Sequence, residues 1–206
     1  MNKPTKAESD FASEVLQKVG LFMRTFQQPT PIGFINAAVD LFVLRASLIE
    51  EEFLEFLEAK NQEEQLDALC DLLYVAAGGF ITCGFRMKEF KTFAQAVPFG
   101  RAVAEMRREF LVQPCEKGLR NRGSSLILTN IRAGQTMFKK FNGAFNAVHD
   151  NNMDKAWTEE ELKFIPDGGH ATKFDTKGPR CYAVMNAKKK IIKPPGFKKV
   201  DLTPYL

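Results

Sequence analysis

The stretch LIEEEFLEFLEAKNQEEQLDALCDLLYV, residues 48–75, holds nine carboxylates and one basic residue in a chain whose formal net charge is +4. Apolar residues recur every three or four positions on both sides of the segment AKNQ, residues 59–62. This spacing is typical of amphipathic helices, so the stretch predicts two helices joined by a tight turn. Helices connected so closely are expected to run antiparallel and to pack together.

The boundaries of these helices follow from local signals. The first helix is expected to run from about Ala37 to Lys60, because no glycine or proline interrupts it. Asn61 followed by Glu64 is a capping-box pattern, which predicts the start of the second helix. An earlier amphipathic helix is expected behind a Ser9 cap, and it ends at the proline-rich residues 27–31.

The acidic residues of the hairpin fall on one face of each helix, at about 100° per residue. These residues are Glu51, Glu52 and Glu55 on the first helix and Glu64, Asp67 and Asp71 on the second. Because the turn is short, we expect Glu55 to lie level with Asp67. Glu52 should likewise lie level with Asp71. The two acidic faces would then confront each other.

Like charges held so close destabilise the fold unless a cation cancels them. Carboxylates on facing helices suit Mg²⁺ or Mn²⁺ rather than zinc, which prefers His or Cys. A plainer interpretation stays open, because acidic residues often cover a solvated helix face. Glu50, Glu58 and Glu63 are expected to be of that kind, Glu64 has a capping role, and Asp71 would face water. The pairing of two acidic faces favours the metal site.

Other features limit the class of protein. The four cysteines lack zinc-finger spacing, and disulfides are poorly supported. The first ten residues lack an apolar core, and the longest apolar run, residues 72–85, is shorter than the about 20 residues that span a membrane. We therefore expect a soluble, cytoplasmic protein without a membrane partner. Residues 178–199 are basic and contain no acid, and their alternation predicts a small hairpin turning near Asn186 and Ala187.

Three motifs resemble those of a known superfamily. EEFLE at 51–55 with EQLD at 64–67 resembles the EExxE…ExxD signature of the all-α nucleoside triphosphate pyrophosphohydrolases, which include MazG, dimeric dUTPases and dCTP pyrophosphatases. FNAVHDNNMDK at 145–155 is similar to the VHxSNMSK element of the phosphoribosyl-ATP pyrophosphohydrolase-like branch, although Asn151 and Asp154 replace its serines. KKKIIKPPGFKKVDL at 188–202 resembles the closing GKVxKPPGYxxPDL of that branch.

The resemblance implies hydrolysis of a ribo- or deoxyribonucleoside triphosphate between the α and β phosphates, which yields a monophosphate and pyrophosphate. It implies a site in which Mg²⁺, with Mn²⁺ as an alternative, is held by Glu52, Glu55, Glu64 and Asp67. Asp71 and Glu51 would bind a second ion or orient water, and Glu51 or Glu52 would be the general base. Candidate substrate-binding residues are Asn152, Lys155, Lys190, Lys193 and His149, the last with a structural hydrogen bond as its alternative role.

The predicted fold class is all-α, an antiparallel helical bundle with a MazG-like four-helix core. One domain is expected over residues 1–206, with a metal-binding helical core at 9–85 and a helical insertion at 86–140. Residues 141–206 would hold the Asn-Met-Lys element and a basic, irregular or β-hairpin flap. Such helices complete their cores against a partner, so we expect a homodimer or homotetramer. Two rival interpretations remain, a nucleic-acid-binding module and a helical scaffold whose metal site has decayed.

Overall fold

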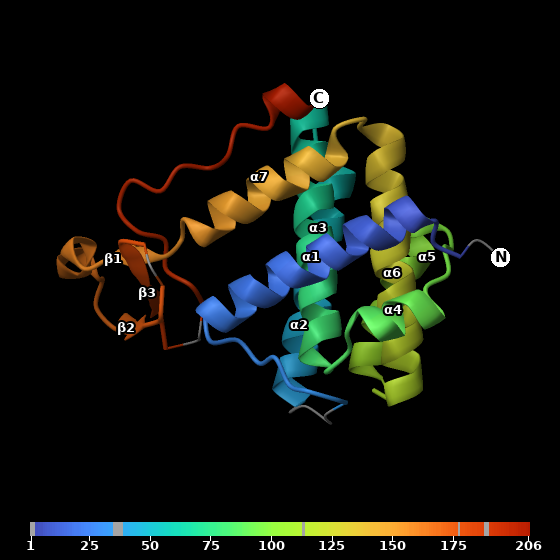
Figure 1. Ribbon diagram of the computed structural model, residues 1–206, viewed down its shortest axis with the longest axis horizontal. Helices are drawn as coiled ribbons and strands as arrows, with labels where there is room; N and C mark the ends of the chain where they lie inside the picture. Colours follow the sequence, from blue (N-terminus) through green and yellow to red (C-terminus); the bar gives the residue numbers. More distant parts are fainter. Residues whose placement is uncertain (1–2, 35–38, 113, 177, 188–189) are drawn as a thin grey trace.

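The computed structural model describes residues 3–34, 39–112, 114–176, 178–187 and 190–206. Helices make up most of it, and a small sheet follows them (Figure 1). The helices are α1 (Lys6–Thr25), α2 (Val39–Glu58), α3 (Gln62–Thr82), α4 (Met87–Phe93), α5 (Phe99–Leu111), α6 (Glu116–Met137) and α7 (Phe141–Met153). The C-terminal flap contains β1 (Trp157–Thr158), η1 (Glu160–Phe164), β2 (His170–Lys173), β3 (Arg180–Met185) and η2 (Thr203–Tyr205).

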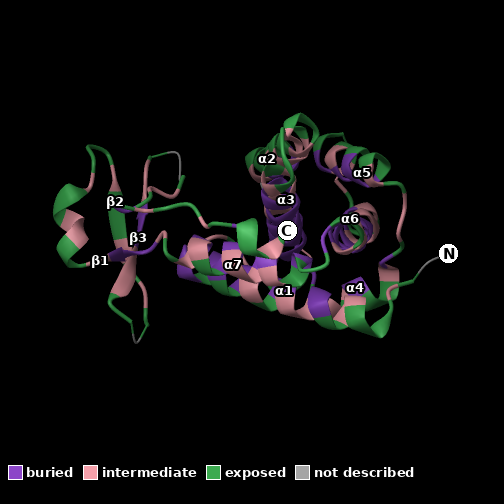
Figure 2. Cartoon of the chain, turned by 90° about the horizontal axis from the view of Figure 1, so that it is seen from above, coloured by how far each residue is buried: buried purple, intermediate pink, exposed green. Residues whose placement is uncertain are grey.

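Four helices form a closed ring, in which α2 and α6 each pack against both α3 and α5. Seen from above, these four helices stand side by side, and α1 and α7 lie across them (Figure 2). Both crossing helices pack on α3, which is therefore covered on most of its sides. The prediction of an all-α bundle with a small C-terminal flap is confirmed.

The segment 86–140, which the sequence marks off as an insertion, supplies half of this ring. It contains α4, α5 and α6. Leu126, Ile127 and Ile131 of α6 are fully buried in the same apolar core as Leu69 and Leu73 of α3. Burial of this kind contributes about 1.5–3 kcal/mol for each large apolar side chain. The segment is thus part of the bundle that positions the acidic hairpin.

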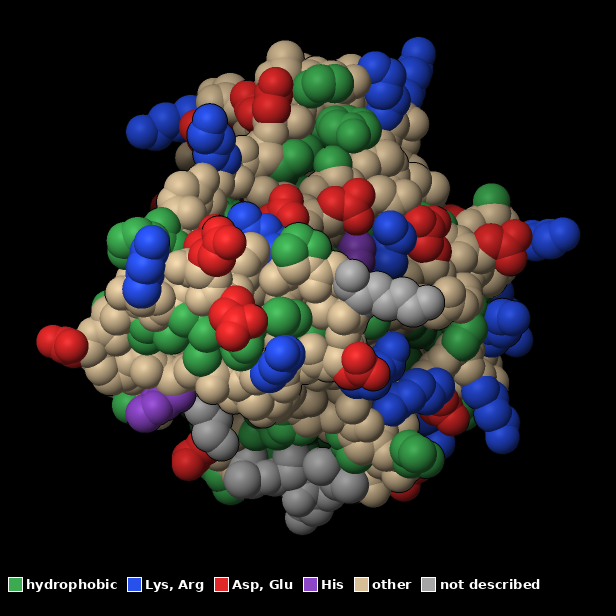
Figure 3. Space-filling view, turned by 60° about the vertical axis from the view of Figure 1, so that its left-hand side comes forward, with side chains coloured by type: hydrophobic (Ala, Val, Ile, Leu, Met, Phe, Trp, Pro, Cys, Tyr) green, Lys and Arg blue, Asp and Glu red, His purple; other side chains and the backbone are tan. Residues whose placement is uncertain are grey.

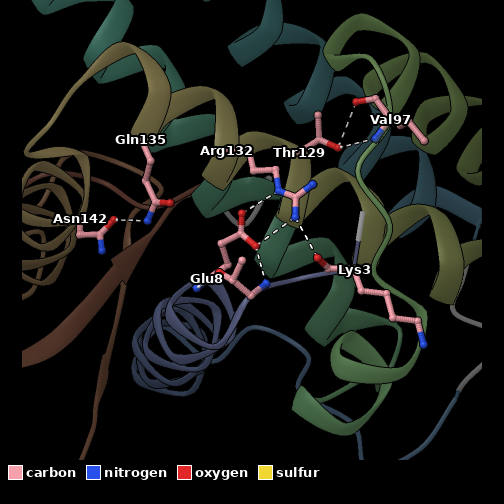
Figure 4. Close-up of polar contacts among 8 residues, drawn as sticks. Lys3, Glu8, Val97, Thr129, Arg132, Gln135 and Asn142 are labelled. Carbon is pink, nitrogen blue, oxygen red and sulfur yellow. Dashed lines mark hydrogen bonds and ion pairs between the residues drawn. The ribbon is translucent and has the colours of Figure 1, made fainter. Parts of the chain in front are cut away.

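The first helix begins earlier than the Ser9 cap predicts, and that expectation is wrong. Thr5 is the N-cap: its hydroxyl accepts a hydrogen bond from the Glu8 backbone, and its own backbone N–H donates to the Glu8 carboxylate. This capping box satisfies two backbone donors, whereas Ser9 lies inside the helix. Glu8 also accepts a 2.6 Å hydrogen bond from Arg132 of α6, which fastens α1 to the ring (Figure 4).

The acidic hairpin has the predicted antiparallel arrangement. Asn61 caps α3 by accepting a hydrogen bond from the Glu64 backbone at 2.9 Å, as the capping pattern predicts. The reciprocal bond of Glu64 goes to the backbone N–H of Lys60, one residue before the cap. α2 ends at Glu58, two residues short of its predicted end, and the predicted start at Ala37 lies outside the described residues.

The flap is a three-stranded antiparallel sheet in the order β1-β3-β2. The predicted hairpin near Asn186 and Ala187 is only partly correct. At the end of β3, the described residues form one bridge between Met185 and Ile191, and two backbone bonds run from Asn186 to Lys190 and from Ile192 to Val184. The main partners of β3 are instead β1 and β2, whose short, polar sequences carry little strand signal.

No single helix in the described part of the chain is long and apolar enough to cross a membrane. α3 and α4 reach that length and composition only together, and the chain bends by 107° between them. Most residues of α3 are buried among the other helices of the bundle.

Candidate active site

The acidic faces of α2 and α3 meet along one side of the hairpin. Glu52 and Asp71 line the same cavity of about 200 Å³, together with Asn152 and Lys155 from the end of α7. Glu52 and Asp71, which the sequence predicts to lie level, are thus brought to one cavity. Asn152 and Lys155 also belong to the set predicted to bind substrate, so the structure brings residues of two separate motifs to one site.

Burial and mutual repulsion control the charge of these carboxyls. Burial and, after it, the nearby carboxylates, Asp71 first, together raise the pKa of Glu52 to about 8. The pKa of Asp71 is raised to about 7, mainly by burial and then by Asp67, although Lys155 and Lys199 partly oppose the rise. Without an added cation the cluster therefore holds protons at neutral pH. Oxygen donors that repel one another in this way suit a hard divalent cation.

Asp67 is already paired. Its carboxylate lies 2.6 Å from the ammonium of Lys199, and its side chain is 10% exposed. The C-terminal segment reaches this position because α7 holds it: the Asn151 side chain donates to the carbonyl of Lys198 and accepts from the backbone of Val200. Asn151, which replaces a serine of the family element, thus connects the motif at 145–155 with the motif at 188–202.

The remaining predicted metal ligands lie farther out. Glu64 is exposed, and its carboxylate accepts hydrogen bonds from the Lys60 backbone and the Asn61 side chain, so the capping role is observed for it. Glu51 and Glu55 are exposed at the rim of the site. Within the described residues, no group of three or more His, Cys, Asp or Glu is arranged closely enough to hold a metal ion.

The donor set nevertheless fits magnesium in its chemistry. All the predicted ligands are carboxylates, which is the ligand type that Mg²⁺ prefers. Four neighbouring carboxylates raise the pKa of Glu52, so they lie close enough to repel its negative charge. They are Asp71, Glu55, Glu51 and Asp67. An ion at this position would remove the repulsion.

The predicted substrate-binding residues differ in how close they lie to the cavity and in how far they are buried. Lys155 is half-buried and donates to the side-chain oxygen of Asn152. Burial lowers the pKa of Lys155, and the carboxylate of Asp71 opposes this shift. Lys193 is exposed, with its ammonium 5.0 Å from the centre of the Phe197 ring.

Two further candidates do not line the cavity. The backbone of the exposed Lys190 donates to the side chain of Asn186, on the far side of the flap turn. His149 is buried, and its Nδ1 lies 3.1 Å from the hydroxyl of Tyr74. Tyr74 itself lines the cavity, so His149 supports the wall rather than forming it. The structural hydrogen bond considered for His149 is observed.

The cavity also has lining residues that sequence reasoning missed, above all Arg45, Gln28 and Tyr74. Arg45 precedes Glu52 by seven residues, which is two turns of α2, so both side chains fall on the same face. That spacing was the available signal. A second, wider hollow of about 490 Å³ lies between Gln135, Lys140 and Tyr205, away from the acidic hairpin.

The sequence profile of the phosphoribosyl-ATP pyrophosphohydrolase family matches residues 19–94. The match covers less than half of the chain, and it shows a similarity of this region to that family. Neither the curated proteins nor the solved structures contain a match to the chain. The family supports a nucleotide pyrophosphohydrolase kind of activity.

The matched region contains every acidic residue of the predicted site. It extends from the second half of α1 to the end of α4. Asn152, Lys155 and Lys199 lie beyond residue 94, as do α5 and α6. The cavity is therefore built by the family region on one side and by residues outside it on the other.

Proposed function

We propose that the protein is a Mg²⁺-dependent nucleoside triphosphate pyrophosphohydrolase that cleaves between the α and β phosphates and releases the monophosphate and pyrophosphate. One observation carries the proposal. Glu52 and Asp71 line one cavity together with Lys155 and Asn152. Acidic groups that repel one another beside a half-buried lysine suit a ligand that combines divalent cations with phosphates.

The chain's own residues account for most of the reaction. Magnesium, held by Glu52, Glu55, Glu64 and Asp67 with Asp71 beside them, would neutralise phosphate oxygens and acidify a water molecule. The ammonium of Lys155 donates hydrogen bonds to a phosphate oxygen and so keeps the triphosphate in place. Glu51 or Glu52 accepts the proton of the attacking water while the bond between the α-phosphorus and the bridging oxygen breaks.

The decisive experiment incubates the purified protein with Mg²⁺ and each ribo- and deoxyribonucleoside triphosphate, and separates the products by chromatography. We expect the monophosphate and pyrophosphate in equal amounts. Glu52→Gln should lower the rate by about two orders of magnitude or more. Glu58→Gln, an exposed acid at the end of the same helix, is the matched control. Stepwise loss of single phosphates would contradict the cleavage position.

The same variants separate the enzyme from a scaffold with a decayed site. Binding to the folded state raises the melting temperature by mass action. We expect Mg²⁺ or Mn²⁺ to raise it in the natural chain and in Glu58→Gln, and to have no effect in Glu52→Ala. A decayed site would give no rise in any of the three proteins.

A nucleic-acid-binding role receives less support from the surface. On the face shown in Figure 3, basic side chains are interspersed with acidic ones rather than gathered in one patch. Within the basic C-terminal segment, Lys199 is paired with Asp67. Salt-sensitive binding of DNA or RNA by the chain, without a metal requirement, would reverse this judgement.

We also propose that the chain forms a homodimer or homotetramer in the cytoplasm. Exposed apolar side chains lie within about 60° of one another around α2. These are Val39, Val43, Leu54 and Leu57. A second copy of the chain would cover this stripe, and light scattering during gel filtration tests the assembly. Four free cysteines, two of them buried, suit a reducing compartment.

A further inference from the structure

Arg45 is a buried cation that lacks a counter-charge. The residue is 6% exposed. Among the residues that the structure describes, no carboxylate forms an ion pair with it. Within this described part of the chain, its Nε has no hydrogen-bond partner, and its Nη2 donates one long bond, 3.3 Å, to the side-chain oxygen of Gln28.

Such an arrangement opposes folding. A charge removed from water destabilises the protein unless hydrogen bonds and an opposite charge compensate it. Burial lowers the pKa of Arg45 to about 10, which still leaves the group charged at neutral pH. The protein gives this group only one long hydrogen bond, to Gln28, and leaves its Nε without a partner among the described residues, so the guanidinium has donor capacity for a ligand.

The position of Arg45 connects it with the active site. Arg45 and Glu52 lie at opposite ends of one cavity, about 10 Å apart along α2 at 1.5 Å per residue. On α3, Gly78 and Asp71 occupy the corresponding ends in reverse order. The cavity is thus elongated, with a carboxylate end and a guanidinium end.

Gly78 makes room for the guanidinium. A Cβ atom at this position would lie 3.2 Å from Nη1 of Arg45, closer than is usual for such contacts. A side chain at 78 would therefore press on the guanidinium and narrow this end of the cavity. The glycine keeps the cavity open where Arg45 enters it.

The walls between the two ends are mainly apolar. They include Phe22, Met23, Tyr74 and Val75. A flat aromatic ring gains from burial between such side chains, whereas a phosphate group would lose its hydration without gaining partners. The guanidinium end is therefore suited to a base, and the carboxylate end to the phosphates and their cation.

We propose that Arg45 recognises the base of the nucleotide and selects a 6-oxopurine, the ring system of guanine and hypoxanthine. This inference rests on the proposed function. The guanidinium donates two parallel hydrogen bonds to O6 and N7, and the amide nitrogen of Gln28, which lines the same cavity, donates a third. Adenine presents an amino group in place of O6, so that a donor would face a donor.

Binding of non-hydrolysable α,β-methylene triphosphates, measured by calorimetry with Mg²⁺, tests the proposal without turnover. We expect the guanosine and inosine analogues to bind at least about tenfold more tightly than the adenosine analogue, as one bidentate contact implies. Arg45→Lys, which keeps the charge but loses the planar fork, should reduce this preference to about twofold or less. Arg101→Lys, at an exposed arginine of α5, should leave the preference unchanged.

A second variant distinguishes recognition from a structural role. Arg45→Met replaces an unpaired buried charge by an apolar chain of similar length, so the metal-free protein should melt at the same or a higher temperature. The base preference should be lost. A lower melting temperature together with an unchanged preference would assign Arg45 to the fold and overturn the proposal.

Two other results would also overturn it. If Arg45→Lys weakens all analogues and free pyrophosphate equally, Arg45 binds a phosphate group. If the natural protein prefers a pyrimidine or adenine, the ring assignment is wrong. Failure of the proposed function is recognised separately, since it would abolish hydrolysis of every nucleotide while a purine preference in binding would persist.

Discussion

The ammonium of Lys199 lies 2.6 Å from the carboxylate of Asp67, although Asp67 belongs to the first sequence motif and Lys199 to the last. A lysine in this position competes with a divalent cation for the same oxygens. Lys199→Gln should therefore strengthen Mg²⁺ binding by about twofold to fivefold, the range for a largely exposed ion pair. Calorimetry measures the change, and Lys198→Gln is the neighbouring control. Weaker Mg²⁺ binding in Lys199→Gln would show that the lysine assists the ion.

The stability of the metal-free protein should fall as the pH rises through the range in which Glu52 loses its proton. The pKa of Glu52 is raised from 4.5 to about 8, so between these values the folded state binds more protons than the unfolded state. The free energy of unfolding therefore decreases with pH over this window. Denaturation in the presence of a chelator should show this decline, and Glu52→Gln should reduce it. A stability that rises from pH 5 to pH 8 in the natural chain would contradict the assignment.

The contact between Glu8 and Arg132 should stabilise the docking of α1 on the ring. Glu8→Gln removes a charge-assisted hydrogen bond and weakens the capping box, so a loss of about 1–2 kcal/mol is expected in chemical denaturation. Arg132 lowers the pKa of Glu8 below 4.5, so this stabilisation is present at neutral pH and is lost as the pH falls through the folded-state pKa. Glu14→Gln, in an exposed pair on the same helix, should have little effect.

Asn151 should control how firmly the C-terminal segment stays on the bundle. Its side chain makes one bond to the Lys198 carbonyl and one to the Val200 backbone. Asn151→Ala removes both bonds, and local opening should then become more frequent. Limited trypsin digestion should cut after Lys198 or Lys199 several times faster than in the natural chain. Asp154→Ala, at an exposed position just beyond α7, serves as the control, and equal cleavage in both variants would refute the assignment.

Much of the fold follows from periodicity and capping in the sequence. The acidic hairpin has the predicted antiparallel pairing because the turn is short and Asn61 determines where α3 begins. The Ser9 prediction failed because the Thr5 and Glu8 pair is a complete capping box, and a complete box outweighs a single serine. β1 is only two residues long, so its pairing with β3 depends on tertiary contacts that no local pattern encodes.

The site is predictable only in its acidic half. The positions of Glu52 and Asp71 in their helices predict that the two side chains lie on facing sides of the hairpin. Nothing near Lys199 in the sequence indicates that this residue reaches Asp67. A single arginine in a helix usually extends to solvent, so the sequence around Arg45 does not indicate that it is buried. It is buried next to Gly78 of α3 and Gln28 beyond α1, and these contacts are a property of the whole fold.

The border of the family match and the border of the cooperative folding unit do not coincide. A protein cut after residue 94 would retain all six carboxylates but lose α5 and α6. The inner surface of α3 would then be left bare, and the fragment would be expected to aggregate. Excision of the recognisable region is therefore a poor route to a minimal enzyme, and grafting studies need the entire ring of helices.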